Sequence, residues 1–294
     1  MSDPVRVLML IDGFRMGGAE RLFAALLPEL DTTRVTPIVC TLNERWDSEI
    51  ANSLDTFEGG RHTLNASRLF DPGALVRLVK LIREERIDVI HAQLTDSTVL
   101  GAIAGWLTGR PVMLTRHTLE QVERHPRARL RWWLELAFSR RVARCVLAVS
   151  RAVRHFLLDR RHQPDRVHVV YNGIRLSEFE GQDSDVIMAR REEFGIKPED
   201  KVIVTVAVLR PGKGHEVLLR AMRRIIEQEP QAKLLLVGDG PRWAELRDMC
   251  AEFGLQDVVI FAGQRSDVAD LLALSRVFVL PSYFEALPTV LIEA

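Results

Sequence analysis

The feature that most constrains this chain is the regular alternation of short apolar runs with longer amphipathic segments. Runs rich in Val, Ile and Leu are typical of buried parallel strands, and the segments between them are typical of crossover helices. The predicted strands lie at 5–11, 34–42, 61–65, 87–92, 111–116, 144–150, 166–172, 201–209, 232–240, 258–263 and 276–282. The pattern therefore predicts an α/β fold built on doubly wound parallel sheets.

The alternation is interrupted once, over residues 173–200, which are rich in charge and contain no apolar strand. At 294 residues the chain is also longer than one hydrophobic core usually serves. We therefore expect a Rossmann-like domain over 1–172, a linker over 173–200 and a second Rossmann-like domain over 201–294.

Composition excludes several classes of protein. Forty Lys and Arg residues balance forty Asp and Glu residues, whereas dedicated nucleic-acid binders carry a net basic surface. The three cysteines, Cys40, Cys145 and Cys250, lie far apart without a C-x-x-C pair, and the chain does not open with a secretory signal. No apolar stretch reaches the roughly 18 residues of a spanning helix. We expect a protein of the reducing cytoplasm that binds no nucleic acid.

Ligands of doubly wound sheets bind at the carboxyl ends of the strands, so the loops there are the candidates for chemistry. After the first strand, Gly17 and Gly18 let the backbone approach a ligand, and the helix that follows directs free N–H groups toward it, which suits a phosphate. A tight turn that needs glycine is the alternative. The glycines lack the G-x-G-x-x-G spacing of nicotinamide-binding proteins.

Histidines lie at the ends of two predicted strands in the first domain. His117 follows the strand at 111–116 and could hydrogen-bond a hydroxyl or an oxyanion. His91 ends the strand at 87–92 and offers the same chemistry. Either histidine could instead be a polar residue whose partners lie within the fold.

The loop at 209–215 carries two cations, Arg210 and Lys213, directly after a buried strand, with glycines that free the backbone. Two cations at close range can bind a diphosphate, and solvated surface charge is the alternative. In the next such loop, Gly238 and Gly240 permit a sharp turn and the close approach of a flat ring or a ribose.

The last stretch, 284–294, places two carboxylates around a predicted helix start. Pro288 suits the first turn of a helix, and Glu293 lies eight positions after Glu285, about 80° round a helix at ~100° per residue. We therefore expect both carboxylates to face one side, together with the free amides that follow Glu285. Carboxylates bind sugar hydroxyls and helix amides bind phosphate, so the stretch predicts a nucleotide-sugar site.

Residues 124–144 hold seven arginines together with an apolar stripe at helical spacing. A core-facing helix with a solvated basic side would explain this pattern, and so would a patch that contacts anionic lipid headgroups. The second interpretation predicts binding to anionic membranes at low salt.

In their order along the chain, these motifs resemble the retaining glycosyltransferases of family 4, which have the GT-B fold of two Rossmann-like domains. The matching motifs are GGAE at 17–20, TRHT at 115–118, YNGI at 171–174, LRPGKGH at 209–215, GDGP at 238–241 and the E-x7-E stretch FEALPTVLIEA at 284–294. The resemblance covers essentially the whole chain.

The resemblance implies a role for each matching position. The implied catalytic residues are His117, Arg210, Lys213 and Glu285. The implied donor-binding residues are Gly17, Gly18, Gly238, Gly240, Ala286, Leu287, Thr289 and Glu293. The two cations would neutralise the donor diphosphate, Glu285 would face the transferred sugar and Glu293 would hold the ribose. His117 would contact the sugar from the acceptor-side domain.

The sequence departs from the family pattern at two places. Many members have an arginine at the position of Val208, so Arg210 would serve with Lys213 alone, and the loss of one charge donor at a transition state costs about 3 kcal/mol. Members also continue beyond the E-x7-E stretch through further βα units. We therefore expect an incomplete second domain and a chain that is shortened at its C-terminus relative to the family.

The resemblance implies a hexosyltransferase that moves a sugar from a nucleoside diphosphate to a hydroxyl of a glycan or lipid-linked acceptor, as in surface glycan or glycolipid synthesis. No cofactor and no metal are expected, because cations and amides would take the charge of the departing diphosphate. Peripheral contact with the inner face of an anionic membrane, through 124–144, is a further expectation.

Three alternatives remain open at this point. The first is a catalytically silent nucleotide-sugar-binding or scaffold protein, which Val208 and the shortened second domain favour. The second is another GT-B enzyme, such as an epimerase or a phosphorylase. The third is a nicotinamide-dependent dehydrogenase, which the glycine spacing disfavours.

Overall fold

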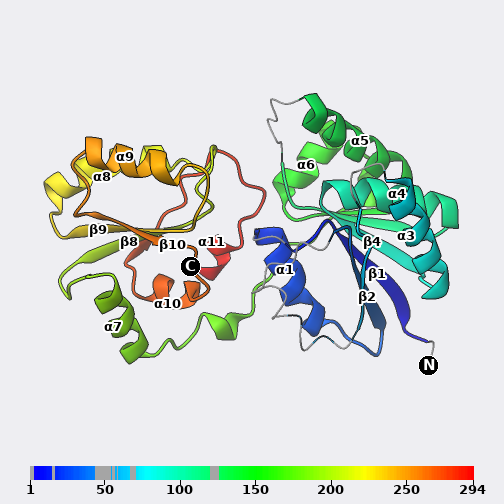
Figure 1. Ribbon diagram of the computed structural model, residues 1–294, viewed down its shortest axis with the longest axis horizontal. Coiled ribbons are helices and arrows are strands. Elements are labelled where there is room, and N and C mark those ends of the chain that lie inside the picture. The colour runs from blue at the N-terminus through cyan, green and yellow to red at the C-terminus, as the bar shows by residue number, and fades with distance from the viewer. Residues whose placement is uncertain are drawn as a thin grey trace. The chain divides into compact units, whose positions relative to one another are not determined.

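The computed structural model describes residues 3–14, 17–43, 54, 57, 59–66, 71–119 and 126–294. The chain divides into two compact units, Met1–Gly173 and Ile174–Ala294, each with its own parallel sheet (Figure 1). All of the strands predicted from the sequence are present, most of them shorter than predicted. The two parallel-sheet α/β domains expected from the sequence are thus confirmed.

The sheet of the first unit has the strand order β3-β2-β1-β4-β5-β6-β7. Its strands are β1 (Val5–Ile11), β2 (Val35–Thr41), β3 (Gly60–Thr63), β4 (Val89–Gln93), β5 (Val112–Arg116), β6 (Cys145–Ala148) and β7 (Val167–Val169). Its helices are α1 (Gly18–Leu26), α3 (Pro72–Glu84), α4 (Thr95–Thr108), α5 (Pro126–Val142) and α6 (Arg151–Asp159), with 3-10 turns at Leu27–Glu29 and Pro164–Arg166. The order reverses between β1 and β4, which places a ligand-binding switch point at their carboxyl ends.

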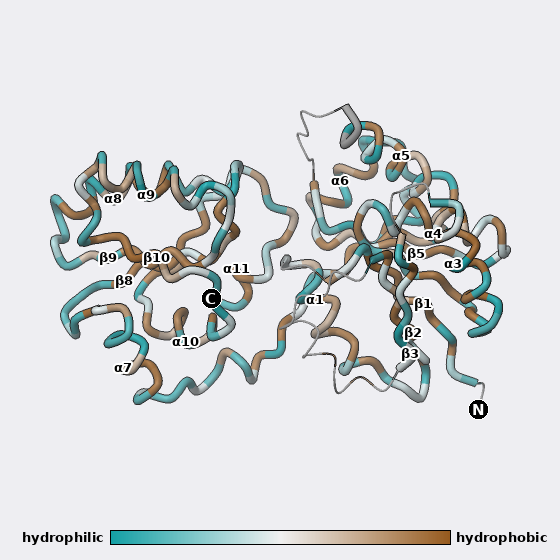
Figure 2. The backbone as a smooth tube through the Cα atoms, in the orientation of Figure 1, coloured by the Kyte–Doolittle hydropathy of each residue, from teal (hydrophilic) through white to brown (hydrophobic). Residues whose placement is uncertain are grey.

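Alternation along β1 sends its side chains into two separate cores. Met9 and Ile11 pack with Phe14 and Phe23, so α1 covers that face of the sheet. On the other face, α4 packs beside Leu10. In Figure 2 the hydrophobic colour follows the strands at the centre of each unit, as expected for a sheet that is covered on both sides.

The sheet of the second unit has the strand order β10-β9-β8-β11. Its strands are β8 (Lys201–Val206), β9 (Ala232–Val237), β10 (Val259–Gly263) and β11 (Val277–Phe278). Its helices are α7 (Ser184–Glu193), α8 (His215–Gln228), α9 (Trp243–Glu252), α10 (Val268–Ala273) and α11 (Val290–Glu293), with a 3-10 turn at Leu176–Glu178. Helices α8 and α9 cover one face, and α7 and α10 cover the other (Figure 1).

The boundary between the units differs from the expected linker over 173–200. Helix α7 lies inside that range, and the second unit begins at Ile174. Ile187 and Phe194 pack against the core around Ile196, and Arg190 Nε lies 2.7 Å from Asp267 Oδ2. The sequence did not predict this helix, because only a few of its residues are apolar and pack against the core. Ion pairs supply much of the remaining attachment.

Two expectations from composition can be compared with the structure. Within the described ranges, none of the helices has both the length and the apolar character that crossing a membrane requires. Cys40, Cys145 and Cys250 are all free thiols.

Candidate active site

Three loops meet at the carboxyl ends of the strands in the second unit. They are 207–214 after β8, 238–242 after β9 and 279–289 after β11. The Leu209 amide donates a hydrogen bond to the Asp239 carbonyl over 2.9 Å, and the Tyr283 amide donates one to the Gly212 carbonyl over 2.9 Å. The structure therefore brings together the motifs LRPGKGH, GDGP and FEALPTVLIEA.

Glycine is required where these loops touch. A Cβ on Gly214, which has φ 70°, would lie 2.0 Å from the carbonyl oxygen of Pro281. A Cβ on Gly238, which has φ 135°, would lie 2.1 Å from the carbonyl oxygen of Ala207, and a Cβ on Gly240 would lie 2.5 Å from that of Leu209 in the same loop. Loop packing therefore explains Gly238 and Gly240, while their contact with a donor stays a prediction.

An ion pair joins two of the loops. Lys213 Nζ lies 2.6 Å from Glu285 Oε1, and the two side chains are only 16% and 24% exposed. An ammonium and a carboxylate at this degree of burial interact more strongly than a pair in open solvent. A cation and a carboxylate from separate sequence motifs thus form one polar centre.

Arg210 occupies the same loop as Lys213. Its side chain is exposed and makes no hydrogen bond or ion pair within the described ranges of the chain. Val208, at the position where many family members have arginine, is 39% exposed. The loop therefore presents two cations, one of which is neutralised by Glu285.

A second polar cluster supports the loops from the side. Arg242 donates to Glu216 over 2.6 Å and to Glu245 over 2.6 Å, and the Tyr283 hydroxyl donates to Glu216 over 3.3 Å. Burial opposes the ionisation of Glu216, but a backbone hydrogen bond and Arg242 outweigh it, so the pKa of Glu216 is lowered. This cluster joins the loops after β9 and β11 to the first turn of α8.

His215 is a buried residue that the sequence analysis quoted in a motif but did not select. It is fully buried at the first turn of α8, and neither ring nitrogen has a hydrogen-bond partner within the described ranges. Burial lowers its pKa to about 4, and the charges of Arg242 and Lys213 contribute. His215 is therefore a neutral imidazole, and it follows Lys213 closely in the chain.

Glu285 lies outside the helix of the C-terminal stretch. Helix α11 begins at Val290, and a 3.2 Å hydrogen bond from the Leu291 amide to the Pro288 carbonyl extends the turn back to the proline. The helical angle between Glu285 and Glu293 therefore does not apply, and that both carboxylates face one side stays a prediction. The proline at 288 disfavours helical backbone at the residue before it, which separates Glu285 from the turn.

The remaining donor-binding candidates of this stretch lie close to that turn. Ala286, Leu287 and Thr289 precede α11 and are half-buried, and Glu293 is its last residue. The Thr289 carbonyl accepts from the Glu293 amide over 3.0 Å. The amides of this short turn and the Glu293 carboxylate thus lie within the stretch that follows Glu285 in the chain, and their contact with a donor stays a prediction.

In the first unit, His117 lies just past the end of β5. Its Nε2 is 2.9 Å from Gln93 Oε1 at the end of β4, and burial, reinforced by the charge of Arg116, lowers its pKa to about 4. His91 Nε2 lies 2.7 Å from Thr115 Oγ1, and burial lowers its pKa to about 4 as well. His91 thus has a partner within the fold, which was the alternative interpretation for it.

Gly17 and Gly18 open helix α1, as the sequence predicts. The Gly17 backbone is extended and α1 begins at Gly18. The Glu20 carboxylate folds back over this end, since a Cβ on Gly17 would lie 2.3 Å from Glu20 Oε2. Burial raises the pKa of Glu20. The position predicted for a phosphate is thus occupied by a carboxylate of the same helix.

Asp12 is a buried carboxylate at the end of β1 that the sequence analysis did not select. The Ser97 amide donates to it over 2.7 Å and the Asp96 amide over 3.3 Å. These amides belong to the first turn of α4, whose cap position is Leu94 in a positive-φ conformation with no capping side chain. Asp12 therefore caps α4 from another element, and burial raises its pKa to about 6.

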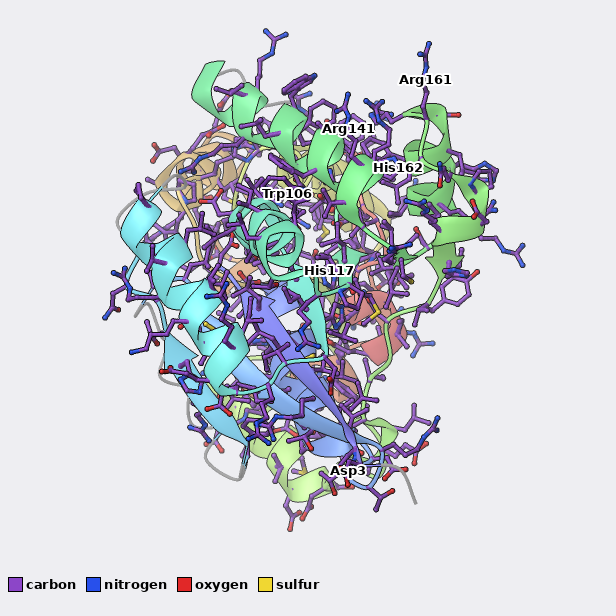
Figure 3. The ribbon with its side chains drawn as sticks, turned by 90° about the vertical axis from the view of Figure 1, so that its right-hand side faces the viewer. Asp3, Trp106, His117, Arg141, Arg161 and His162 are labelled. Carbon is purple, nitrogen blue, oxygen red and sulfur yellow. The ribbon has the colours of Figure 1, made fainter. Side chains whose placement is uncertain are left out.

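Helix α5 contains most of the basic stretch 124–144, of which residues 124 and 125 lie outside the described part of the chain. Leu130 and Trp133 are more than half exposed on it, and Trp106 on the adjacent α4 is 76% exposed. Figure 3 labels Trp106 and Arg141 on these two helices. Apolar and basic side chains therefore share this surface.

No group of three or more His, Cys, Asp or Glu side chains within the described ranges is arranged to hold a metal ion.

Comparisons with known proteins agree with this architecture. Residues 16–178 match the family model for Glycosyltransferase Family 4, and residues 187–294 match the model for Glycosyl transferases group 1. The chain is similar to the UDP-Gal:alpha-D-GlcNAc-diphosphoundecaprenol alpha-1,3-galactosyltransferase of Escherichia coli, with 28% identity over 78% of this chain and 61% of that protein. It is 29% identical to the putative glycosyltransferase EpsF of Bacillus subtilis over its whole length, which spans 77% of EpsF.

Solved structures share the fold. The crystal structure of HepE from Anabaena, in complex with UDP and glucose, has a TM-score of 0.84 at 24% identity, with 99% of this chain and 78% of that chain covered. The structure of WaaG, a glycosyltransferase involved in lipopolysaccharide biosynthesis, has a TM-score of 0.74 at 16% identity, with 98% and 78% covered.

Proposed function

Since the chain belongs to glycosyltransferase family 4, we propose that it transfers a sugar from a nucleoside diphosphate sugar to an acceptor hydroxyl, with retention of configuration at the anomeric carbon. The observation that carries this proposal is the Lys213–Glu285 pair, in which an ammonium and a carboxylate lie 2.6 Å apart where three loops meet. A nucleotide sugar offers the groups that these side chains bind, a diphosphate and hydroxyls.

In the proposed reaction the second unit binds the donor. Lys213 and Arg210 contact the diphosphate, and Glu285 accepts hydrogen bonds from the sugar hydroxyls. As the bond from the anomeric carbon to the diphosphate breaks, negative charge grows on the departing oxygen, and the cations stabilise that charge. The acceptor hydroxyl bonds to the anomeric carbon on the same face, and its proton passes to the departing diphosphate. The cations take the part that a divalent metal plays in other transferases, so no cofactor is assigned.

We propose UDP as the nucleotide of the donor. HepE was crystallised with UDP, with UDP-glucose, and with UDP and glucose, and the name of the Escherichia coli relative specifies UDP-Gal. The motifs alone favour no base. Calorimetry with UDP-glucose, GDP-mannose and ADP-glucose tests the choice, and preferred binding of either of the last two would contradict it.

For the acceptor we propose a lipid-linked glycan at an anionic membrane surface. The relative from Escherichia coli is named for a diphosphoundecaprenol-linked sugar, and WaaG is described as acting in lipopolysaccharide biosynthesis. In this chain, the exposed Trp133 lies on α5 together with Arg129 and Arg141, and the exposed Trp106 lies on the adjacent α4. Aromatic and basic side chains on one surface suit the interface of an anionic membrane.

The transfer reaction itself provides the test. The chain is incubated with UDP-glucose or UDP-galactose and a sugar-diphosphate-polyprenol acceptor, with and without EDTA, and the product is analysed by NMR for the new anomeric bond. We expect an α-linked product at the same rate in both conditions. An inverted product would contradict retention, and a requirement for added metal would contradict the metal-free mechanism.

Val208 favours a second candidate, a protein that binds the nucleotide sugar without transferring it. The loop lacks the arginine that many family members place there, which removes one charge donor from the departing diphosphate. In that case calorimetry would show donor binding, and neither transfer nor donor hydrolysis would be detected. Hydrolysis of UDP-glucose that disappears in Lys213→Ala would exclude this candidate.

A further inference from the structure

Three side chains of the second unit bury polar atoms that have no hydrogen-bond partner within the described ranges of the chain. The atoms are Thr205 Oγ1, Ser282 Oγ and both ring nitrogens of His215. Thr205 is 1% exposed and His215 is fully buried. A buried polar group without a hydrogen bond costs free energy, so each of these atoms requires an explanation.

His215 and Thr205 belong to the same layer of the second unit, between α8 and the sheet. On α8, His215 lies on the buried stripe that continues through Leu218 and Met222. Thr205 pairs with Leu236 in the register of β8 and β9, and Leu236 belongs to the core into which that stripe packs. His215 is the first residue of α8 and Thr205 is the second-to-last residue of β8, so both lie toward the carboxyl end of the strand.

Ser282 approaches the start of α8 from the loop after β11. The backbones of the two segments touch, since a Cβ on Gly214 would lie 2.0 Å from the carbonyl oxygen of Pro281. Gly214 directly precedes His215, and Pro281 directly precedes Ser282. The polar side chains therefore gather where the first turn of α8 meets the loop after β11.

The chemistry of these groups suits an uncharged network. Burial lowers the pKa of His215 to about 4, so near pH 7 one ring nitrogen donates and the other accepts. Each hydroxyl can donate and accept. A water molecule inside a protein typically makes about three hydrogen bonds to polar groups that lack other partners. Two hydroxyls, one imidazole and one water can therefore satisfy all four buried atoms.

We propose that Thr205, His215 and Ser282 hold an internal water molecule that links the first turn of α8 to the loop after β11. His215 lies two residues after Lys213, and Ser282 lies three residues before Glu285. The link thus fixes the two loops whose side chains form the ion pair, and its members are positioning residues. An effect on donor binding rests on the proposed function, whereas the link itself does not.

A crystal structure of the full chain that resolves ordered water tests the site directly. We expect a water within hydrogen-bond distance of a ring nitrogen of His215 and of Ser282 Oγ. We expect no water there in His215→Leu. A ring nitrogen bonded directly to the serine hydroxyl, or a ring that no water contacts, would overturn the proposal.

Hydrogen exchange measures the link without any ligand. The Tyr283 amide donates to the Gly212 carbonyl over 2.9 Å, so its protection reports the contact between the two loops. In His215→Leu we expect this protection to fall about tenfold, the value of one hydrogen bond. The Leu209 amide, which donates to the Asp239 carbonyl over 2.9 Å, is the control and should keep its protection.

Further variants separate the link from the filling of space. Leucine fills the position of His215 with apolar atoms, whereas His215→Gln keeps a donor and an acceptor and should retain the protection of the Tyr283 amide. Ser282→Ala should lower that protection, and adding it to His215→Leu should cause no further loss, because both changes break one network. Met222→Leu, on the same face of α8, should have no effect. Wild-type protection in both His215→Leu and Ser282→Ala would contradict the link.

Binding of UDP tests the consequence for the donor. We expect His215→Leu to bind UDP about fivefold more weakly, because a less ordered loop must be fixed on binding, and His215→Gln to bind as wild type does. Unchanged affinity in His215→Leu would contradict the effect on the donor. If the wild-type chain binds no UDP, the proposed function fails, and the crystal structure and the exchange measurement still decide the water site.

Discussion

At the scale of single residues, the proposed reaction depends on how Glu285 shares Lys213 with the donor. The carboxylate lies 2.6 Å from the ammonium, at the position where the mechanism requires a phosphate oxygen. A diphosphate must therefore displace Glu285 or share the cation with it, and the two negative groups repel each other. A sugar whose hydroxyls occupy Glu285 relieves this conflict, which favours the intact donor over free nucleotide.

Glu285→Gln separates these two effects. We expect the affinity for UDP to rise about fivefold, because a repelling charge is removed, and the rate of sugar transfer to fall about a hundredfold. Calorimetry with UDP and the transfer assay measure the two quantities. Glu229→Gln is the matched control, since Glu229 pairs with Lys201 at 2.5 Å on the opposite end of β8. A loss of UDP affinity in Glu285→Gln would contradict this account.

Val208→Arg tests the departure from the family pattern. The new cation would lie on the loop that carries Arg210 and Lys213, at a position that is 39% exposed. We expect the rate of transfer to increase about tenfold or more, because a further charge donor acts on the departing diphosphate. Val217→Arg, at a 44% exposed position on α8, is the control and should leave the rate unchanged. Equal rates in the two variants would show that Arg210 already supplies this charge.

The sequence predicted single residues where a motif places a charged side chain after a strand. Lys213 and Glu285 were selected from separate motifs, and the structure brings them into contact. Gln93 and Asp12 were not selected, because each acts through a partner that lies far along the chain. Such contacts depend on which strands and helices become neighbours, and no local spacing encodes that.

At the scale of secondary structure, Asp12 connects the end of β1 to the start of α4. Its carboxylate accepts hydrogen bonds from two amides of the first turn, which stabilises that end of the helix. Burial opposes its negative charge and raises its pKa to about 6, above the ordinary value of 3.8. The capping interaction is therefore accompanied by a cost of desolvation.

That cost predicts a dependence of stability on pH. A carboxyl whose pKa is higher in the folded state contributes stability that is complete below about pH 3.8 and is lost as the pH rises through about 6. Asp12→Asn keeps an amide oxygen as the cap and does not titrate. We expect its free energy of unfolding, relative to wild type, to increase by roughly 2 kcal/mol between about pH 4 and pH 7. Urea unfolding followed by tryptophan fluorescence measures this difference, and a constant difference would contradict it.

The helices and strands that bury the most apolar surface were the easiest to predict from the sequence. The strands were found from the sequence because their apolar runs are buried on both faces, as in β1 and β8. Helix α7 was missed because ion pairs such as Arg190 with Asp267 supply much of its attachment. Helix α11 begins at Val290, just after Pro288 as the sequence predicts, because a proline suits the first turn of a helix.

At the scale of the whole molecule, the two units contribute different chemistry. The second unit carries the proposed diphosphate-binding loops, and the first unit carries His117 and the surface formed by α4 and α5. That surface combines the exposed Trp106 and Trp133 with arginines. Division of labour between units would let one part of the chain contact a membrane-bound acceptor while another binds a water-soluble donor.

Vesicle binding tests that surface. We expect the protein to sediment with anionic vesicles at low salt, to be released as salt screens the arginines, and not to sediment with neutral vesicles. The double variant Trp106→Ala and Trp133→Ala should bind several-fold more weakly, because the aromatic contacts with the interface are lost. Tyr171→Ala removes a 56% exposed aromatic outside α4 and α5 and should bind as wild type does. Equal recovery on neutral vesicles would contradict an electrostatic contact.

The most direct test of the central claim is calorimetry with UDP-glucose on three proteins, the wild type, Lys213→Ala and Lys201→Ala. Both lysines form ion pairs with glutamates in the second unit, Lys213 at the loops and Lys201 at the other end of the same strand. If Lys213 binds the diphosphate, its replacement should weaken binding about tenfold or more, while Lys201→Ala binds as wild type does. Equal affinity in all three proteins, or no binding by folded wild-type protein, would contradict the claim.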